Sequence, residues 1–254
     1  MIDCFNMSIP RLTPEMERRI YVSLPDSYEE DEEGRWPVLY LFDGQNVFFD
    51  EDASFGRSWR MADWLEANQP PVIVVGIESS NVGNGRLQEY SPFSYKEEDG
   101  TFIRGEGRTL LRWMTDTLKP LIDERYRTLP EREATFIAGS SMGGLIALYG
   151  VTHFSDVFGA AAVLSPSLWV HPDKSLSMID SGNFPPHTLI YMDYGSEEMG
   201  NHPANYRCLT NSAVHLMVRD CDLTFRIVPG GSHCEASWET RIPFFMQCLG
   251  LTGD

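Results

Sequence analysis

The sequence is short of basic side chains: its 254 residues hold 20 Lys and Arg against 37 Asp and Glu, a formal net charge of −17. It has no Lys- or Arg-rich run that displaces counterions from a phosphate backbone, which argues against nucleic acid as a partner. It also lacks any run of about 18 apolar residues, which argues against a membrane span. Hydrophobic residues still make up 42% of the chain, enough for a buried core and too many for intrinsic disorder.

Cysteine is scarce and forms no motif. The chain contains Cys4, Cys208, Cys221, Cys234 and Cys248, an odd number without a C-x-x-C pair. This excludes a disulfide framework and a zinc knuckle, so we expect reduced thiols. Residues 1–11 show no basic head followed by an apolar stretch, so we expect no signal peptide and a cytoplasmic protein.

Short β-rich apolar runs alternate along the chain with segments of helical periodicity. This alternation is typical of an α/β fold with a mostly parallel central sheet and helices on both faces. Strands are predicted at 19–24, 38–42, 72–77, 134–138, 160–164, 189–194 and 224–228. Because no internal repeat and no linker-like tract interrupts the pattern, we expect one α/β domain over residues 1–254.

The spacing of apolar residues also predicts the helices. From Leu110 to Ile122 they recur at steps of three and four, which indicates one long helix with a kink at Pro120. Further helices are predicted at 142–153, at about 206–219 and at 236–249, the last with a break at Pro243. The acidic run 29–33 lies between two predicted strands and is expected to form a solvated hairpin loop.

The strongest functional signal is Gly-Ser-Ser-Met-Gly-Gly at 139–144, which follows a predicted strand and opens a predicted helix. A nucleophile elbow requires this context, because its serine lies on a tight strand-to-helix turn flanked by glycines. Ser141 is then the nucleophile. The N–H of Met142 lies at the helix N-terminus, where partial positive charge favours an oxyanion. A Ser/Gly-rich turn without chemistry is the alternative interpretation.

A serine hydroxyl needs a base to accept its proton. In α/β-hydrolases the chain order is nucleophile, acid, base, and His233 is the only one of the six histidines just past the last predicted strand. The acid is expected after the penultimate strand, where Asp193, Glu197 and Glu198 are candidates. We favour Glu198, three residues past Gly195. A solvated acidic turn is the alternative interpretation for all three.

A second oxyanion donor is expected in the loop after the strand at 38–42, which reads Asp43-Gly44-Gln45-Asn46. Gly44 permits a sharp turn that directs the N–H of Gln45 at the site. The side chains of Gln45 and Asn46 are then placed to contact substrate. A purely structural turn explains this segment equally well.

Several motifs together carry a resemblance to a known family. They are Tyr-Leu-Phe-Asp-Gly-Gln-Asn at 40–46, Arg86 with Glu-Tyr-Ser-Pro at 89–92, Leu-Lys-Pro-Leu-Ile-Asp at 118–123, the elbow at 139–144, Ser-Pro-Ser-Leu-Trp at 165–169, and His233 with Trp238. Over nearly the whole chain they resemble the putative esterase family of α/β-hydrolases, which includes enterochelin esterases, feruloyl and acetyl-xylan esterases, S-formylglutathione hydrolase and the mycolyltransferases. The resemblance implies an α/β-hydrolase fold, with Ser141 as nucleophile, His233 as base and a carboxylate at Glu198.

The expected function is therefore a serine carboxylic-ester hydrolase that forms an acyl-enzyme and needs neither a metal nor a cofactor. An acyltransferase of the same fold and a non-catalytic binding module are the alternatives. The interval 165–188 is too short for a large cap domain, so we expect an open cleft walled by Gln45, Trp169, Arg86 and Tyr90. Such a cleft favours short-acyl or aromatic-acyl esters of a bulky alcohol, such as a sugar or a siderophore. The sequence gives no indication of the oligomeric state.

Overall fold

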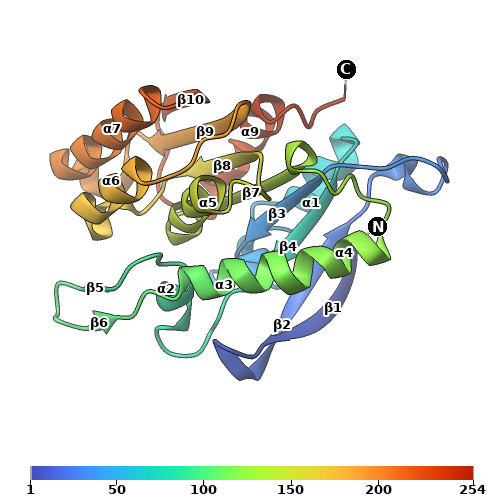
Figure 1. Cartoon of the computed structure of the whole chain (residues 1–254), viewed down its shortest axis with the longest axis horizontal. Coiled ribbons are helices and arrows are strands. Elements are labelled where there is room, and N and C mark those ends of the chain that lie inside the picture. Colours follow the sequence, from blue (N-terminus) through green and yellow to red (C-terminus); the bar gives the residue numbers. More distant parts are fainter. Residues whose placement is uncertain (1, 254) are drawn as a thin grey trace.

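The computed structural model describes residues 2–253. Eight strands form one sheet in the order β1-β2-β4-β3-β7-β8-β9-β10 (Figure 1). The strands are β1 (Ile2–Ile9), β2 (Thr13–Ser23), β3 (Val38–Phe42), β4 (Ile73–Ile77), β7 (Thr135–Ser140), β8 (Ala160–Leu164), β9 (Thr188–Gly195) and β10 (Cys221–Val228). Neighbours run parallel from β4 to β10, whereas β2 is antiparallel to both β1 and β4. The predicted α/β class with a mainly parallel sheet is confirmed.

Helices surround this sheet and complete its layers. They are α1 (Met61–Asn68), α2 (Gly85–Glu89), α3 (Gly107–Trp113), α4 (Lys119–Arg125), α5 (Met142–His153), α6 (Pro172–Asp180), α7 (Pro203–Met217), α8 (Glu235–Glu239) and α9 (Ile242–Cys248). The long predicted helix is present as α3 and α4, which are joined by a π-helical turn directly before Pro120. Helix irregularities of this kind are typical at proline, which has no N–H to donate to the preceding turn. The predicted break near Pro243 separates α8 from α9.

The central strands alternate their side chains between two hydrophobic clusters. In β3, Val38, Tyr40 and Phe42 pack into the cluster on one face of the sheet, and Leu39 and Leu41 pack into the cluster on the other. Because successive strand residues point to opposite faces, a strand that is apolar throughout needs cover on both. The first cluster lies under α3 to α7, and the second under α1, α8 and α9 (Figure 1).

One expectation for the first part of the chain is wrong, and three strands there were not predicted. The acidic run 29–33 is exposed as expected, but it does not close a hairpin. The flanking strands β2 and β3 are not neighbours, because β4 lies between them and pairs with both. The run therefore belongs to a crossover connection. Strand β1 was not predicted, nor was the small antiparallel pair β5 (Tyr95–Lys96) and β6 (Phe102–Ile103).

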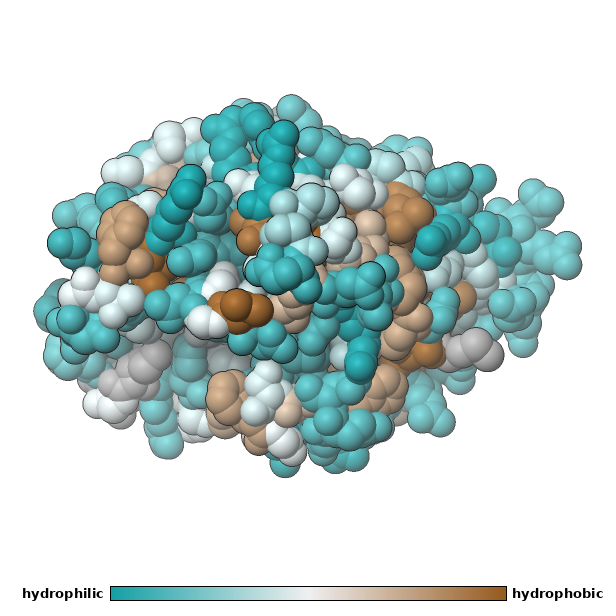
Figure 2. Space-filling view, turned by 90° about the horizontal axis from the view of Figure 1, so that it is seen from below, coloured by the Kyte–Doolittle hydropathy of each residue, from teal (hydrophilic) through white to brown (hydrophobic). Residues whose placement is uncertain are grey.

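The face of the molecule seen in Figure 2 is mostly hydrophilic. Its apolar residues lie in small groups separated by polar ones. Along residues 2–253, no helix has both the length and the apolar character needed to cross a membrane.

Candidate active site

Ser141 lies on a strained turn between β7 and α5. Its backbone angles are φ 57° and ψ −123°, a combination that residues with a side chain rarely adopt. Its N–H donates to the carbonyl of Leu164 at 3.0 Å, which ties the turn to the end of β8. A Cβ at Gly139 would lie 2.6 Å from the backbone carbonyl carbon of Gly143. The strand and the helix approach this closely because residue 139 has no side chain.

The three side chains proposed for catalysis are hydrogen-bonded in series. Nε2 of His233 lies 2.9 Å from Oγ of Ser141, and Nδ1 of His233 lies 2.9 Å from Oε2 of Glu198. The three residues follow β7, β9 and β10, so they meet at the carboxyl edge of the parallel sheet, where such sheets bind their ligands. Of the candidate acids, Glu198 is the one that contacts His233 within the described residues. Glu197 is exposed, and Asp193 forms its bonds elsewhere.

Glu198 is buried and accepts several hydrogen bonds besides that of His233. Its Oε1 atom accepts from Oγ of Ser165 at 2.5 Å, from the N–H of Gly195 at 2.7 Å and from Nη2 of Arg241 at 3.2 Å. Burial acts to raise the pKa of Glu198, but the hydrogen bonds from His233, Ser165 and Gly195 outweigh it and lower the pKa. The carboxylate therefore stays ionised and accepts from Nδ1–H of His233, which leaves Nε2 free to accept the Ser141 proton.

A fully buried arginine connects the two carboxylates behind the histidine. Nη1 of Arg241 lies 2.8 Å from Oδ1 of Asp193, and its Nη2 atom contacts Glu198. Oγ of Ser165 accepts from Nη1 of Arg241 at 2.7 Å and from Nε1 of Trp238 at 3.0 Å. These contacts fix the position of the acid that orients His233. The sequence analysis assigned no role to Arg241 or Ser165, because they meet Glu198 only in the folded chain.

Two backbone N–H groups expected to bind an oxyanion lie at the starts of helical turns. Met142 is the first residue of α5, and Gln45 belongs to the 3₁₀ turn that follows Asp43. The first N–H groups of a helix have no acceptor within it and are available to an anion. The left-handed backbone of the second turn belongs to Asp43, with φ 56°, and not to Gly44. Gly44 is required for another reason: a Cβ there would lie 2.6 Å from the backbone of Gly76 in β4.

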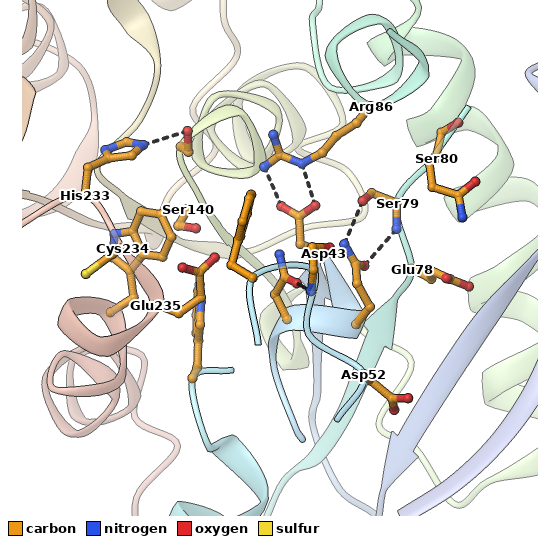
Figure 3. A pocket seen from close by; sticks show the side chains of 18 residues that line it. Asp43, Asp52, Glu78, Ser79, Ser80, Arg86, Ser140, His233, Cys234 and Glu235 are labelled. Carbon is orange, nitrogen blue, oxygen red and sulfur yellow. Dashed lines mark hydrogen bonds and ion pairs between the residues drawn. The ribbon is translucent and has the colours of Figure 1, made fainter. Parts of the chain in front are cut away.

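A cleft of about 670 Å³ opens on the proposed nucleophile and base (Figure 3). Its walls are formed by the loops that follow β3 and β4 and by the segment that begins α8. Of the residues expected to contact substrate, Gln45, Asn46 and Arg86 line this cleft. The amide of Gln45 is held in place by Ser79, since its Nε2 donates to Oγ of Ser79 at 2.9 Å and its Oε1 accepts from the N–H of Ser79 at 3.1 Å.

Trp169 and Tyr90 do not line the cleft, contrary to expectation. Trp169 lies in a 3₁₀ turn after β8, is 37% exposed and is absent from the described lining. Tyr90 is buried, and its hydroxyl accepts a hydrogen bond from the N–H of Asp43 at 2.9 Å. Tyr90 therefore holds the loop that carries Gln45 through this hydrogen bond. A motif places both residues near the sheet edge, but tertiary packing decides where their side chains point.

The sequence analysis missed the aromatic and acidic part of the lining, which includes Phe55, Trp59, Glu78, Glu235 and Trp238. One signal was available, because Glu78 directly follows a parallel strand and ligands bind beyond the carboxyl ends of such strands. Residues 165–188, where we expected no large cap domain, contain the α-helix α6, which packs along α7. None of its residues belongs to the described cleft lining.

A metal-binding cluster is not found in the part of the chain that the structure describes: no group of three or more His, Cys, Asp or Glu side chains is arranged to hold an ion. The five cysteines are free thiols, with Cys4 exposed and Cys208 buried. Burial raises the pKa of Cys208 to about 11, so this thiol is protonated at neutral pH.

The sheet order and the strained serine between β7 and α5 define the fold as that of an α/β-hydrolase. Residues 12–244 match the model of the family described as Putative esterase, and the chain belongs to this family. Membership of this family supports ester hydrolysis as the reaction.

Two curated relatives are similar in sequence. The uncharacterized protein YbbA of Bacillus subtilis (strain 168) is 28% identical over 184 residues, which cover 71% of this chain and 69% of that protein. The Iron(III) salmochelin esterase of Escherichia coli O6:H1 is 30% identical over 107 residues, which cover 41% of this chain and 22% of that protein.

Solved structures share the fold at lower identity. An IroE-like serine hydrolase from Shewanella oneidensis superposes with a TM-score of 0.75 and 20% identity, over 99% of this chain and 79% of that chain. The enterobactin esterase FES from Shigella flexneri, in the presence of enterobactin, superposes with a TM-score of 0.73 and 21% identity. That match covers 98% of this chain and 58% of the esterase. The α/β-hydrolase fold expected from the sequence is thereby confirmed.

Proposed function

We propose that this protein is a serine hydrolase of carboxylic esters that acts through an acyl-enzyme. The observation that carries the proposal is the hydrogen-bonded series Ser141, His233 and Glu198 at the base of a cleft. A serine that donates to a histidine held by an ionised carboxylate is equipped for nucleophilic attack.

In the first half of the reaction, Oγ of Ser141 attacks the carbonyl carbon of the ester. Nε2 of His233 accepts the hydroxyl proton as the new C–O bond forms. The carbonyl oxygen becomes an oxyanion and accepts hydrogen bonds from the N–H groups of Met142 and Gln45. When this tetrahedral intermediate collapses, the bond to the leaving alcohol breaks and Nε2–H of His233 protonates that alcohol. The acyl group remains on Oγ of Ser141.

In the second half a water molecule takes the place of the alcohol. His233 removes a proton from the water, whose oxygen attacks the acyl carbon, and the same N–H groups hold the second oxyanion. Collapse releases the carboxylic acid and returns the proton to Oγ of Ser141. Glu198 carries a negative charge throughout, so it stabilises the imidazolium that forms twice in each turnover.

The substrates we propose are short-acyl or aromatic-acyl esters of a bulky alcohol, such as a sugar or a siderophore. The side of the cleft opposite His233 is built from the loops after β3 and β4, and no residue of α6, the helix between β8 and β9, is among the described residues that line it. Proteins similar to this chain are named for ester substrates of these kinds: salmochelin, enterobactin and ferulic acid. Acetyl and feruloyl esters should be cleaved much faster than esters of about twelve carbons or more.

A fluorophosphonate probe tests the mechanism directly, because it bonds covalently to an activated serine. We expect wild-type protein to be labelled and Ser141→Ala to be unlabelled, with ester hydrolysis reduced on the order of 10³-fold or more. Ser140→Ala is the matched control, since this neighbour also lines the cleft but does not contact His233. Retention of more than about a tenth of the activity in Ser141→Ala would overturn the mechanism. Added alcohols test for acyl transfer in competition with hydrolysis.

A further inference from the structure

The cleft is acidic, in keeping with the charge of the whole chain. Among the described residues, its lining contains the four carboxylates Asp43, Asp52, Glu78 and Glu235 and the single arginine Arg86. The charge of Arg86 is neutralised by Asp43, because both of its hydrogen bonds to that carboxylate are 2.7 Å long. A ligand in this cleft therefore meets a net negative field, which low-dielectric walls strengthen.

Glu235 differs from the other acidic residues of the cleft. Asp52 contacts Arg19 at 2.8 Å, and Glu78 accepts from the backbone N–H of the same arginine at 2.8 Å. Glu235 forms no salt bridge, and no other described residue donates a hydrogen bond to its carboxylate. It is nevertheless only 9% exposed. Its oxygens are not among the fully buried unpartnered atoms of the described residues but face the cleft, so a ligand with a charged donor can pair with them there.

The carboxylate of Glu235 points into the cleft from the side of His233, opposite Ser79 and Ser80 (Figure 3). His233 protonates the leaving alcohol in the proposed reaction, so the group that reaches Glu235 belongs to the alcohol. Burial, the largest cause, and the negative charge of Asp43 raise the pKa of Glu235. A positive charge placed beside Glu235 relieves both effects.

Aromatic rings surround the same space. Trp59 and Trp238 line the cleft with small parts of their surface, 2% and 5% exposed and with ring centroids 6.2 Å apart, and the exposed ring of Phe55 lies at its rim. The faces of aromatic rings attract cations, and their combination with a carboxylate is typical of sites for substituted ammonium groups.

We propose that Glu235, together with Trp59 and Trp238, forms a subsite for a positively charged ammonium group on the alcohol part of the ester. This proposal rests on the proposed function and narrows its substrate class. Among bulky alcohols, the subsite favours cationic ones and disfavours polyanionic ones such as ferric catecholates.

Three acetate esters of equal size test the subsite. Their alcohols end in a trimethylammonium group, a tert-butyl group or a carboxylate. We expect wild-type kcat/KM to be at least about tenfold higher for the cationic ester than for the neutral one, and about tenfold lower for the anionic one. Equal rates for the cationic and neutral esters would overturn the subsite but leave the esterase function intact. Absence of both hydrolysis and fluorophosphonate labelling would instead overturn the proposed function.

A pair of variants separates Glu235 from the general field of the cleft. In Glu235→Gln the cationic-to-neutral ratio should fall to about threefold or less, whereas Asp52→Asn should keep most of it because Arg19 already partners that carboxylate. The ratio is taken within each variant, so a general loss of activity cancels. An unchanged ratio in Glu235→Gln would contradict the assignment.

Binding of the esters to the Ser141→Ala variant, measured by tryptophan fluorescence, tests the subsite without turnover. The trimethylammonium ester should bind at least about tenfold more tightly than its tert-butyl analogue, and equal affinities would contradict the subsite.

Discussion

Two glutamates lie near His233, and their surroundings are opposite. Glu198 is 1% exposed and accepts hydrogen bonds from His233, Ser165, Gly195 and Arg241. Glu235 is 9% exposed and accepts none from another described residue. The pKa of Glu198 is lowered because its hydrogen bonds outweigh burial, whereas burial and Asp43 raise the pKa of Glu235.

The different surroundings of the two glutamates correspond to two tasks of the cleft, proton transfer and substrate recognition. The groups that move protons are held by the protein itself, so their geometry is complete before a substrate arrives. Glu235, which we propose recognises the substrate, has no partner among the described residues, and the ligand supplies one. An unpartnered buried carboxylate lowers stability, a cost that proteins commonly carry at functional sites.

The largest effect on catalysis is expected from a substitution of Glu198, the glutamate that accepts several hydrogen bonds. Glu198→Gln should lower kcat on the order of 10³-fold, because a neutral amide neither holds the histidine tautomer nor stabilises the imidazolium. Its exposed neighbour supplies the control, since Glu197→Gln should change kcat by less than about threefold. Steady-state kinetics with a neutral ester measure both. If the two variants exchange their effects, the orienting acid is Glu197.

A large loss of stability should follow from removing the arginine that partners Glu198. Arg241→Met leaves Asp193 and Glu198 buried without their shared positive charge, so the free energy of unfolding should fall by about 3–5 kcal/mol. Arg57→Met is the comparison, because its ion pair with Glu239 is half-exposed and its removal should lower the free energy of unfolding far less. Urea unfolding distinguishes them. Equal losses would show that Arg241 is not the central charge of this network.

The smallest expected effect concerns pH, and there the two glutamates should change Tm in opposite directions. The lowered pKa of Glu198 contributes stability that is present above about pH 4.5, its unfolded value, and is lost as pH falls through the folded pKa. The raised pKa of Glu235 has the opposite sign, because stability is lost as pH rises through the folded value. At pH 7, Glu198→Gln should therefore lower Tm, and Glu235→Gln should raise it slightly.

The two shifts in Tm should disappear in different pH ranges. That of Glu235→Gln should shrink as the pH falls through the raised folded pKa toward about 4.5, and that of Glu198→Gln should shrink only below about 4.5. Thermal unfolding of the three proteins at a series of pH values from about 3.5 to about 7 measures this. A lowered Tm for Glu235→Gln at pH 7 would contradict the unpartnered state of that carboxylate.

Much of the fold follows from local pattern. The apolar strands β3 and β8 and the helix α5 have the predicted bounds, because a buried strand or helix must be apolar whatever surrounds it. Strand β1 escaped prediction because it is an edge strand in which only Ile9 is buried. The sequence around the acidic run 29–33 predicts a hairpin because the pairing of β4 with both β2 and β3 leaves no local signal.

The candidate site divides in the same way. Ser141 and His233 were predictable, since the elbow needs a defined glycine pattern and the base a defined place in the chain order. Arg241 and Glu235 were not, because a buried charge is identified by its neighbours in space. Trp169 was placed in the cleft on its position in a motif, and the structure turns it outward.

The cleft draws on separate stretches of the chain. Ser141, Glu198 and His233 follow β7, β9 and β10, while much of the opposite wall comes from residues 50–59 and 78–86, which follow β3 and β4. The early loops thus form the wall opposite His233, whereas the catalytic residues and Glu235 come from segments that follow later strands. Descendants of this chain can change the acyl group they accept by altering the early loops, and an engineer can exchange those loops without rebuilding the proton path.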